Sequence, residues 1–200
     1  MRRPAKSSEG ADKKNKEQKF ALGPTISLPA LLEKGHQPDG TFRQLLYDIH
    51  VVANLLESAR EYLAGRLGVS SSQYNIIMVV ARQGREKGLS VSDVATRLNV
   101  TGAFVTNEVK KLVKSGFIHK KSNPDDGRSV LLSLTPAGYA GVQAIEPDIV
   151  SVNDRLFSTL SKSDFQHLAR ITGSLVDVFG QTVAVLKALS AESEKTARIA

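Results

Sequence analysis

The sequence predicts a mainly α-helical protein that carries one small antiparallel β-sheet. Apolar residues recur at helical spacing through most of residues 41–190, which predicts several amphipathic helices. Within residues 117–134 the pattern changes to two short apolar runs on either side of a turn-rich loop, which predicts a β-hairpin. The segment Ser90–Gly138 contains two short helical patterns, then a glycine, then this hairpin.

The chain begins with a basic segment and an irregular arm. Residues 1–19 hold seven Lys or Arg against three Asp or Glu, so they carry +4 of the net charge of +7. This composition predicts a basic disordered tail that adds nonspecific phosphate contacts or serves only solubility. Residues 20–40 hold three prolines, and we expect an irregular N-terminal arm around a short helix in the stretch LPALLEKG.

A long amphipathic helix is predicted over residues 41–68. Its apolar stripe consists of Phe42, Leu45, Leu46, Ile49, Val52, Leu56, Ala59 and Leu63. A second helix opens at Ser70, which stands three residues before Gln73 as in a capping box, and ends at Gly84. The stretch 87–89 is a candidate for a third, short strand.

Two short helices follow in the segment Ser90–Gly138. Ser90 and Asp93 have the spacing of a capping box for the first, and Thr101 is placed to cap the second. The predicted buried stripe of the second helix consists of Val105, Val109, Leu112 and Val113. Gly116 is expected to end this helix, with Phe117 as its apolar contact.

The polar face of the second helix has a chemistry that suits DNA. Thr106 and Asn107 are short hydrogen-bonding side chains that can reach base edges. Three lysines suit phosphates, namely Lys110, Lys111 and Lys114. Thr101, at the start of the helix, completes the candidate contacts on this element. The alternative interpretation is an ordinary solvated amphipathic helix.

The hairpin after this helix strengthens the DNA interpretation. Strands are predicted over 117–121 and 130–134, joined by the turn-rich SNPDDGRS. Arg128 lies near the tip, where a guanidinium can enter a narrow minor groove, and Asp126 is placed to orient it. The alternative is a plain charged hairpin turn. A helix and hairpin in this order predict a winged helix-turn-helix.

Helical patterns return after the hairpin. Thr135 is placed to cap a helix that begins with Pro136, and Pro147 is expected to kink or interrupt it. Its stripe consists of Val142, Ile145, Ile149, Val152, Leu156 and Leu160. Ser161 and Asp164 open a last long helix whose apolar positions are Phe165, Leu168, Ile171, Leu175, Phe179, Val183, Leu186 and Leu189. We expect residues 191–200 to form a flexible tail.

The flanking helices predict a homodimer. Helices that are apolar beyond what their own subunit covers tend to be buried against a partner. We therefore expect helices within 41–65 and 145–190 to form a two-fold interface, with two recognition helices about one DNA turn apart on a pseudo-palindromic operator. The alternative is a monomer whose long helices only enlarge its core.

Several function classes are excluded by the composition. The absence of cysteine excludes disulfides, thiolate metal sites and cysteine-based sensing. The four histidines are scattered without a metal-binding motif, and no phosphate-binding loop or GxSxG elbow occurs, so we expect no metal, no cofactor and no enzymatic activity. No apolar run reaches the ~20 residues of a membrane span, and no secretory signal is present. We therefore expect a cytoplasmic protein without membrane contact.

The run VTNEVKKLVKSGFIHKKSNPDDGRSVLLSLTPAG resembles the signature region of the MarR family of bacterial transcription regulators. The matching positions are Val105, Thr106, Val109, Leu112, Gly116, Pro124, Asp126, Arg128, Leu134, Thr135 and Gly138. The resemblance extends over 41–190. It implies a winged helix-turn-helix DNA-binding domain over 70–138, dimerisation helices over 41–68 and 139–190, and a repressor function. Asn107 departs from the Arg that is usual in the family, and Gly127 replaces a common basic residue.

The resemblance also implies a small-molecule effector. In the family, phenolic or other aromatic acids, some of them as coenzyme A thioesters, bind between the dimerisation helices and the DNA-binding lobe and release the operator. The candidate ligand-binding residues are Tyr47, His50, Asn54 and Arg60, each of which has a surface or interface role as its alternative. The alternative function is a winged-helix module for protein–protein assembly, without sequence-specific DNA binding.

Overall fold

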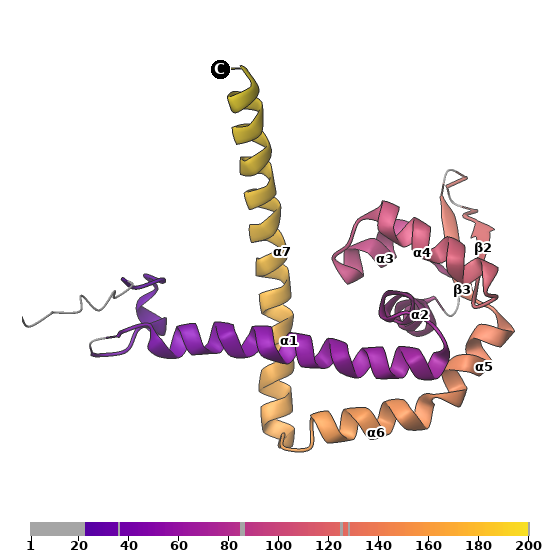
Figure 1. The fold of residues 1–200 in the computed structure, drawn as a ribbon, viewed down its shortest axis with the longest axis horizontal. Coiled ribbons are helices and arrows are strands. Elements are labelled where there is room, and N and C mark those ends of the chain that lie inside the picture. The colour runs from indigo at the N-terminus through magenta and orange to yellow at the C-terminus, as the bar shows by residue number, and fades with distance from the viewer. Residues whose placement is uncertain (1–22, 36, 85–86, 125, 128, 200) are drawn as a thin grey trace, which may run out of the picture. The chain divides into compact units, whose positions relative to one another are not determined.

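The computed structural model describes residues 23–199 apart from residues 36, 85, 86, 125 and 128, and it describes no side chains beyond residue 193. The chain forms two compact units, residues 1–53 and 54–200. Helix α1 (Gly40–Leu67) begins in the first unit and ends in the second. The elements and their order are shown in Figure 1.

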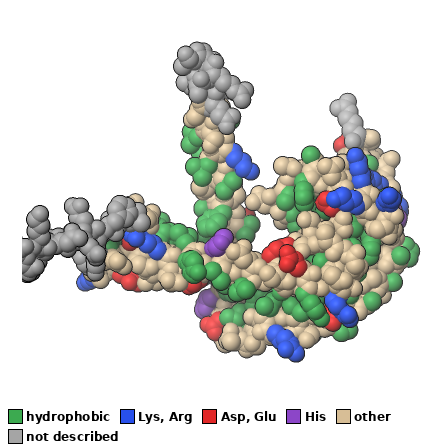
Figure 2. Space-filling model, viewed as in Figure 1, with side chains coloured by type: hydrophobic (Ala, Val, Ile, Leu, Met, Phe, Trp, Pro, Cys, Tyr) green, Lys and Arg blue, Asp and Glu red, His purple; other side chains and the backbone are tan. Residues whose placement is uncertain are grey.

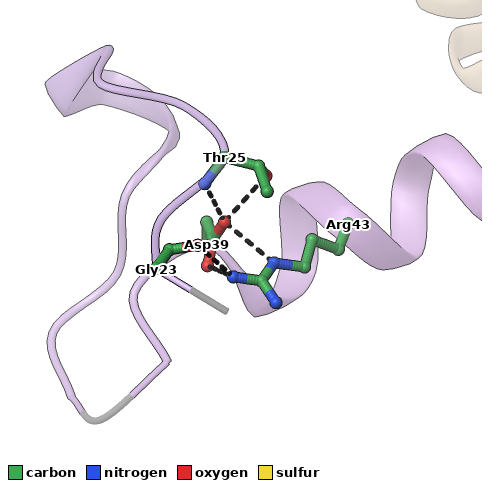
Figure 3. A network of polar contacts seen from close by, with 4 residues as sticks. All are labelled: Gly23, Thr25, Asp39 and Arg43. Carbon is green, nitrogen blue, oxygen red and sulfur yellow. Dashed lines mark hydrogen bonds and ion pairs between the residues drawn. The ribbon is translucent and has the colours of Figure 1, made fainter. Parts of the chain in front are cut away.

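The first unit contains an arm that is fixed to the start of α1. The expected helix in LPALLEKG is only a single 3-10 turn, η1 (Pro29–Leu31). Asp39, 1% exposed, accepts hydrogen bonds at 2.6 Å from the Thr25 N–H and at 2.9 Å from Nε of Arg43 (Figure 3). Arg43 also donates to the Gly23 carbonyl at 2.9 Å. These contacts attach residues 23–25 to the first turn of α1.

The second unit has its main core between three helices and a small sheet. Helices α2 (Ser71–Gln83), α3 (Val91–Leu98) and α4 (Gly102–Lys114) surround this core together with the strands (Figure 1). The most deeply buried of its side chains are Ile76, Ile77, Val80, Val94, Val105, Val109, Leu112, Ile118 and Leu132. These positions follow the helical and strand periods of the sequence, so burial of one apolar face of each element accounts for the packing.

The sheet has the strand order β1-β3-β2, with both pairs antiparallel. Strand β2 (Ile118–Ser122) pairs with β3 (Val130–Leu134) in the predicted hairpin, and Ile118 lies opposite Leu134. The expected third strand is present as β1 (Leu89–Ser90), with Leu89 opposite Leu132. The hairpin is therefore attached along one side to the strand that leads into α3.

The predicted helix caps are confirmed. Capping boxes join Ser70 to Gln73 at the start of α2 and Ser90 to Asp93 at the start of α3. Helix α3 ends at Asn99, whose φ of 51° lies in the left-handed region that Asn tolerates better than most residues. The tight turn between α3 and α4 follows from this ending.

The helix expected after the hairpin is interrupted close to Pro147, as one of the two expected outcomes, and forms two helices, α5 (Pro136–Ala144) and α6 (Glu146–Leu156). Pro147 lies in the first turn of α6, where no intrahelical donor is lost. Ile145 lies at the break and packs with Leu63 and Tyr74 in a second core cluster. The Arg66 Nε donates to Asp148 at 3.0 Å, so α1 and α6 are also joined by an ion pair.

The last helix, α7 (Lys162–Ile199), continues past residue 190 to Ile199, through part of the expected flexible tail. Ser161 and Asp164 cap its start as predicted. Its side chains from Lys162 to Ser193 are all exposed, including Phe165 at 59% and Val176 at 65%. This chain alone leaves the apolar side of α7 uncovered.

Helix α7 also corrects one expectation about membranes. By length and composition alone, the helix Lys162–Ser193 is apolar enough to cross a membrane, because it contains an 18-residue window with a mean hydropathy of 1.3. The sequence expectation that no stretch meets this test was wrong, because Asp177 and Lys187 are the only charged residues between residues 171 and 189. A single helix of this kind is a weak indication of a membrane protein.

Candidate DNA-binding surface and effector cavity

Helix α4 is fixed at both ends by contacts that its sequence predicts. The Thr101 hydroxyl accepts a hydrogen bond from the Phe104 N–H at 3.2 Å and so caps the helix. At the other end Gly116 has a φ of 79°, and the Phe117 N–H donates to the Leu112 carbonyl at 2.9 Å. The Gly116 N–H donates to the Val113 carbonyl at 3.1 Å, which completes a Schellman motif. Helix α4 therefore has defined ends.

One side of α4 is buried and the opposite side is exposed. Val105, Val109 and Leu112 are fully buried, as predicted, but Val113 is 41% exposed, so its place in the buried stripe was wrong. Val113 lies two turns after the half-buried Thr106 on the same side of α4, at the edge of the buried stripe. Glu108, which is 9% exposed, belongs to the buried side of the helix instead.

The exposed side of α4 brings together most of the candidate DNA contacts. Asn107, Lys110 and Lys114 follow at helical spacing along the middle of this side, opposite Val109 and Leu112. Lys111 lies on the flank instead, where its Nζ donates to Glu108 Oε1 at 2.7 Å. The Glu108 Oε2 accepts from Nε2 of Gln73 in α2 at 3.1 Å.

The hairpin turn between β2 and β3 is closed by hydrogen bonds. The Ser129 N–H donates to the Asp126 carbonyl at 3.0 Å, and the Asn123 N–H donates to the Ser129 carbonyl at 3.1 Å. Asp126 and Gly127 are exposed. Arg128 lies outside the described residues, so the predicted pairing of Asp126 with Arg128 stays a prediction.

Basic side chains gather over α4 and β2 (Figure 2). Besides the lysines of α4, the exposed Lys120 and Lys121 of β2 belong to this group. The sequence interpretation used these two residues only as part of a strand. Their position in the strand that follows the recognition helix was the available signal for a phosphate contact.

A cavity of about 410 Å³ lies between α1, α2 and α6 in the second unit. Its apolar lining includes Leu56, Leu63, Met78, Val79, Leu98, Ile149, Val152, Leu156 and Phe157. The polar lining includes two guanidinium groups, Arg60 and Arg82. Tyr74 also lines this cavity. Burial raises the pKa of the Tyr74 hydroxyl above its ordinary value, and the nearby charge of Arg60 offsets only part of this increase.

Of the four candidate ligand residues, Arg60 lines this cavity and the other three are not among its lining residues. Tyr47 and His50 are exposed residues of α1 in the first unit, and Asn54 is an exposed residue of α1 in the second. Arg60 also pairs with Glu57 at 3.4 Å. Arg82 and Tyr74 were missed, because only the packing of α2 against α1 and α6 places them at the cavity.

Among the residues that the structure describes, no three His, Asp or Glu side chains are grouped so that they could hold a metal ion. The buried side-chain nitrogen and oxygen atoms of the same residues all have hydrogen-bond partners.

Residues 67–129 match the family model described as MarR family. An uncharacterized protein of Mycobacterium tuberculosis is 32% identical over 123 residues, which cover 62% of this chain and 83% of that protein. The transcriptional repressor YetL of Bacillus subtilis is 26% identical over 132 residues, 66% of this chain and 77% of YetL.

Solved structures share the fold. A MarR/EmrR family regulator from an Acinetobacter species has a TM-score of 0.61 at 20% identity, over 70% of this chain and 96% of that one. MepR of S. aureus, in a complex with DNA, has a TM-score of 0.57 at 20% identity, over 66% and 96%. CouR of Rhodococcus jostii, bound to p-coumaroyl-CoA, has a TM-score of 0.61 at 15% identity, over 66% and 91%.

The family match covers α2, α3, α4, β2 and the turn after it, and it therefore includes α4 and β2, which carry the cationic surface. The structural matches extend the agreement over about two thirds of the chain. The chain is a winged-helix, DNA-binding transcriptional regulator of the MarR family.

Proposed function

We propose that this regulator is a cytoplasmic homodimeric repressor that binds a pseudo-palindromic operator and is released by a small aromatic acid or its coenzyme A thioester. The observation that carries the DNA part is the exposed side of α4, where Asn107 lies in line with Lys110 and Lys114. Members of the family are transcriptional regulators rather than enzymes, and the proposal includes no catalytic step.

Asn107 and Thr106 are assigned to base edges, and Lys110 and Lys114 to phosphates. The hairpin would follow the adjacent minor groove, with Lys120 and Lys121 near the backbone. MepR, which shares the fold, was solved in a complex with DNA. YetL, which is similar in sequence, is named a repressor. The MepR complex supports DNA binding, and the name of YetL supports repression as the direction of regulation.

The proposed dimer rests on uncovered apolar surface. On α7, large apolar side chains are exposed along the whole described length, from Phe165 at 59% to Leu189 at 54%. On α1, Leu45, Val52 and Leu55 are each at least 52% exposed. A soluble protein rarely leaves so much contiguous apolar area in water, and a second copy of these helices would cover it.

The proposed effector class follows from the cavity lining. A volume of about 410 Å³ falls within the range that holds a small organic ligand. Apolar walls suit an aromatic ring, and Arg60 and Arg82 suit a carboxylate or phosphate. CouR was solved with p-coumaroyl-CoA, an aromatic thioester, which supports this class. No cofactor is proposed.

The DNA proposal is tested by titrating the purified protein with its own promoter region and with scrambled duplexes of equal length, at several salt concentrations. We expect the promoter to bind at least ~1000-fold more tightly than scrambled DNA, with a steep salt dependence. Equal affinity for all duplexes, or no binding at low salt, contradicts it. No binding together with capture of a partner protein would favour the assembly module.

The dimer and effector proposals need separate measurements. Sedimentation equilibrium is expected to give twice the chain mass at micromolar concentration, and a monomer contradicts the dimer. A thermal-shift screen of aromatic acids and their thioesters is expected to find a compound that both stabilises the protein and weakens operator binding. A stabilising compound that leaves operator binding unchanged contradicts the regulatory role of the cavity.

A further inference from the structure

Glu108 is an acidic residue on the side of α4 that packs into the protein. Its side chain is 12% exposed, whereas that of Lys111, one turn later, is 63% exposed. One carboxylate oxygen accepts from Lys111 at 2.7 Å, and the other accepts from Gln73 at 3.1 Å. The hydrogen bond from Lys111 is the main cause of a lowered Glu108 pKa, so Glu108 is ionised at neutral pH.

Gln73 is itself fixed. Its Oε1 accepts from the Ser70 N–H at 3.2 Å, and its N–H donates to the Ser70 hydroxyl at 3.3 Å, in the capping box of α2. Because Oε1 is held by the cap, Nε2 is directed to Glu108. The carboxylate is therefore held from α2, and it holds Lys111 in turn.

The position of Lys111 sets it apart from the other two lysines of α4. Lys110 and Lys114 lie along the middle of the exposed side, while Lys111 lies on the flank beside Glu108. A lysine that neutralises a DNA phosphate increases the salt dependence of binding by about one counterion. A lysine paired with a carboxylate adds no net charge to the surface, so its contribution is largely cancelled.

We propose that Glu108, fixed by Gln73, limits the affinity of this regulator for DNA by holding Lys111 on the flank of the recognition helix. The proposal rests on the DNA contact of α4 proposed above. Phosphate contacts strengthen binding to every sequence, whereas base contacts strengthen binding to one. By withholding one phosphate contact, Glu108 increases the share of the binding free energy that depends on Thr106 and Asn107.

The test is the Glu108→Gln variant, which keeps the shape of the side chain and an acceptor for Gln73. We expect it to bind scrambled duplexes about five- to tenfold more tightly, with a salt slope larger by about one. The ratio of operator to scrambled affinity should fall. Glu146→Gln is the matched control, because it removes the same charge from α6. Unchanged binding by Glu108→Gln, or an equal gain in both variants, overturns the proposal.

The role of Lys111 is tested in the same measurement. In the Glu108→Gln/Lys111→Ala double variant the additional salt slope should disappear. In the otherwise unchanged chain, Lys111→Ala should reduce the slope by less than Lys110→Ala does, and this comparison remains decisive if Glu108→Gln fails to fold. Equal reductions overturn the proposal. If the parent protein binds no duplex, the proposed function itself is contradicted. If the parent protein binds DNA and the Glu108→Gln variant binds it with the same affinity and salt slope, only the role of Glu108 is contradicted.

Discussion

The Thr135 hydroxyl donates a hydrogen bond to the Gly116 carbonyl at 2.5 Å. The same oxygen accepts from the Gly138 N–H at 2.9 Å, in the first turn of α5. A single hydroxyl therefore connects the left-handed residue that ends α4 to the helix that follows the hairpin. The Thr135 N–H adds a bond to the Phe117 carbonyl at 3.0 Å.

Replacing Thr135 by Val should lower the free energy of unfolding by about 1–3 kcal/mol, because a cap and a second hydrogen bond are lost. Urea denaturation measures this change. Thr135→Ser keeps the hydroxyl and is the matched control, for which we expect a loss below about 1 kcal/mol. Equal losses in the two variants would show that the methyl group, and not the hydroxyl, stabilises this junction.

Gly138→Ala should be more damaging than most alanine substitutions. An added Cβ would lie 2.3 Å from the Phe117 carbonyl oxygen, which belongs to the backbone and cannot rotate away. We expect a loss of at least about 2 kcal/mol of unfolding free energy by thermal or urea denaturation. Gly65→Ala is the control, since nothing lies within 4 Å of its added Cβ and alanine favours the helix. A tolerated Gly138→Ala would contradict the close approach.

The attachment of the arm should depend on pH only in acid. Hydrogen bonds from Arg43 first, and then from Thr25, hold the pKa of Asp39 well below its usual range. A lowered folded-state pKa contributes stability above the unfolded value of about 4, and this contribution is lost as the pH falls further. The Thr25 N–H resonance should therefore stay constant from pH 7 to about 4 and move below it.

Asp39→Asn should release the arm at neutral pH, because the amide keeps an acceptor but loses the charge that Arg43 neutralises. Faster proteolytic cleavage between residues 23 and 39 is the expected result. Asp48→Asn, on the exposed side of α1, is the control of equal charge change. Equal cleavage rates for Asp39→Asn and the parent would contradict the role of this ion pair.

Asn107→Ala and Lys114→Ala should affect DNA binding differently. Loss of a base contact should cost about 1–3 kcal/mol at one position of the operator and relax its base preference. Loss of a phosphate contact should weaken all duplexes alike and lower the salt slope by about one. Binding to a set of single-base operator variants separates the two. The same pattern for both substitutions would refute the assignment of Asn107 to bases.

Arg60→Ala should increase the effector concentration that releases the operator by about tenfold or more, because a charge-assisted hydrogen bond to an acidic ligand is lost. The measurement is ligand titration of the preformed DNA complex. Arg155→Ala removes an exposed guanidinium of α6 that is absent from the cavity lining, and it is the matched control. Equal shifts would place the ligand elsewhere.

The caps and the hairpin were predictable because they depend on residues close in sequence. The partners of each cap are at most a few positions apart, as for Ser90 with Asp93 and for Gly116 with Val113. The residue types at these positions therefore indicate the cap without knowledge of the tertiary structure. Strand β3 was placed at residues 130–134 as observed, since a turn-rich loop precedes it and the helix start at Thr135 and Pro136 follows it.

The contacts that the sequence did not reveal depend on packing. Gln73 and Glu108 are 35 residues apart and meet only because α2 and α4 pack together. Glu108 had one local signal, since its helical spacing from Val105 and Leu112 puts it on the buried stripe. Lys111 was assigned to phosphates from its type and its place on the polar face, and its pairing with Glu108 depends on the burial of Glu108, which was not expected.

The side chain of Gln73 links local opening of α2 to local opening of α4. The same amide group completes the N-terminal cap of α2 and holds a side chain of α4. If the first turn of α2 opens, Glu108 loses a partner at the same moment. Hydrogen exchange at the start of α2 and along α4 should therefore occur in one cooperative opening rather than in two independent ones.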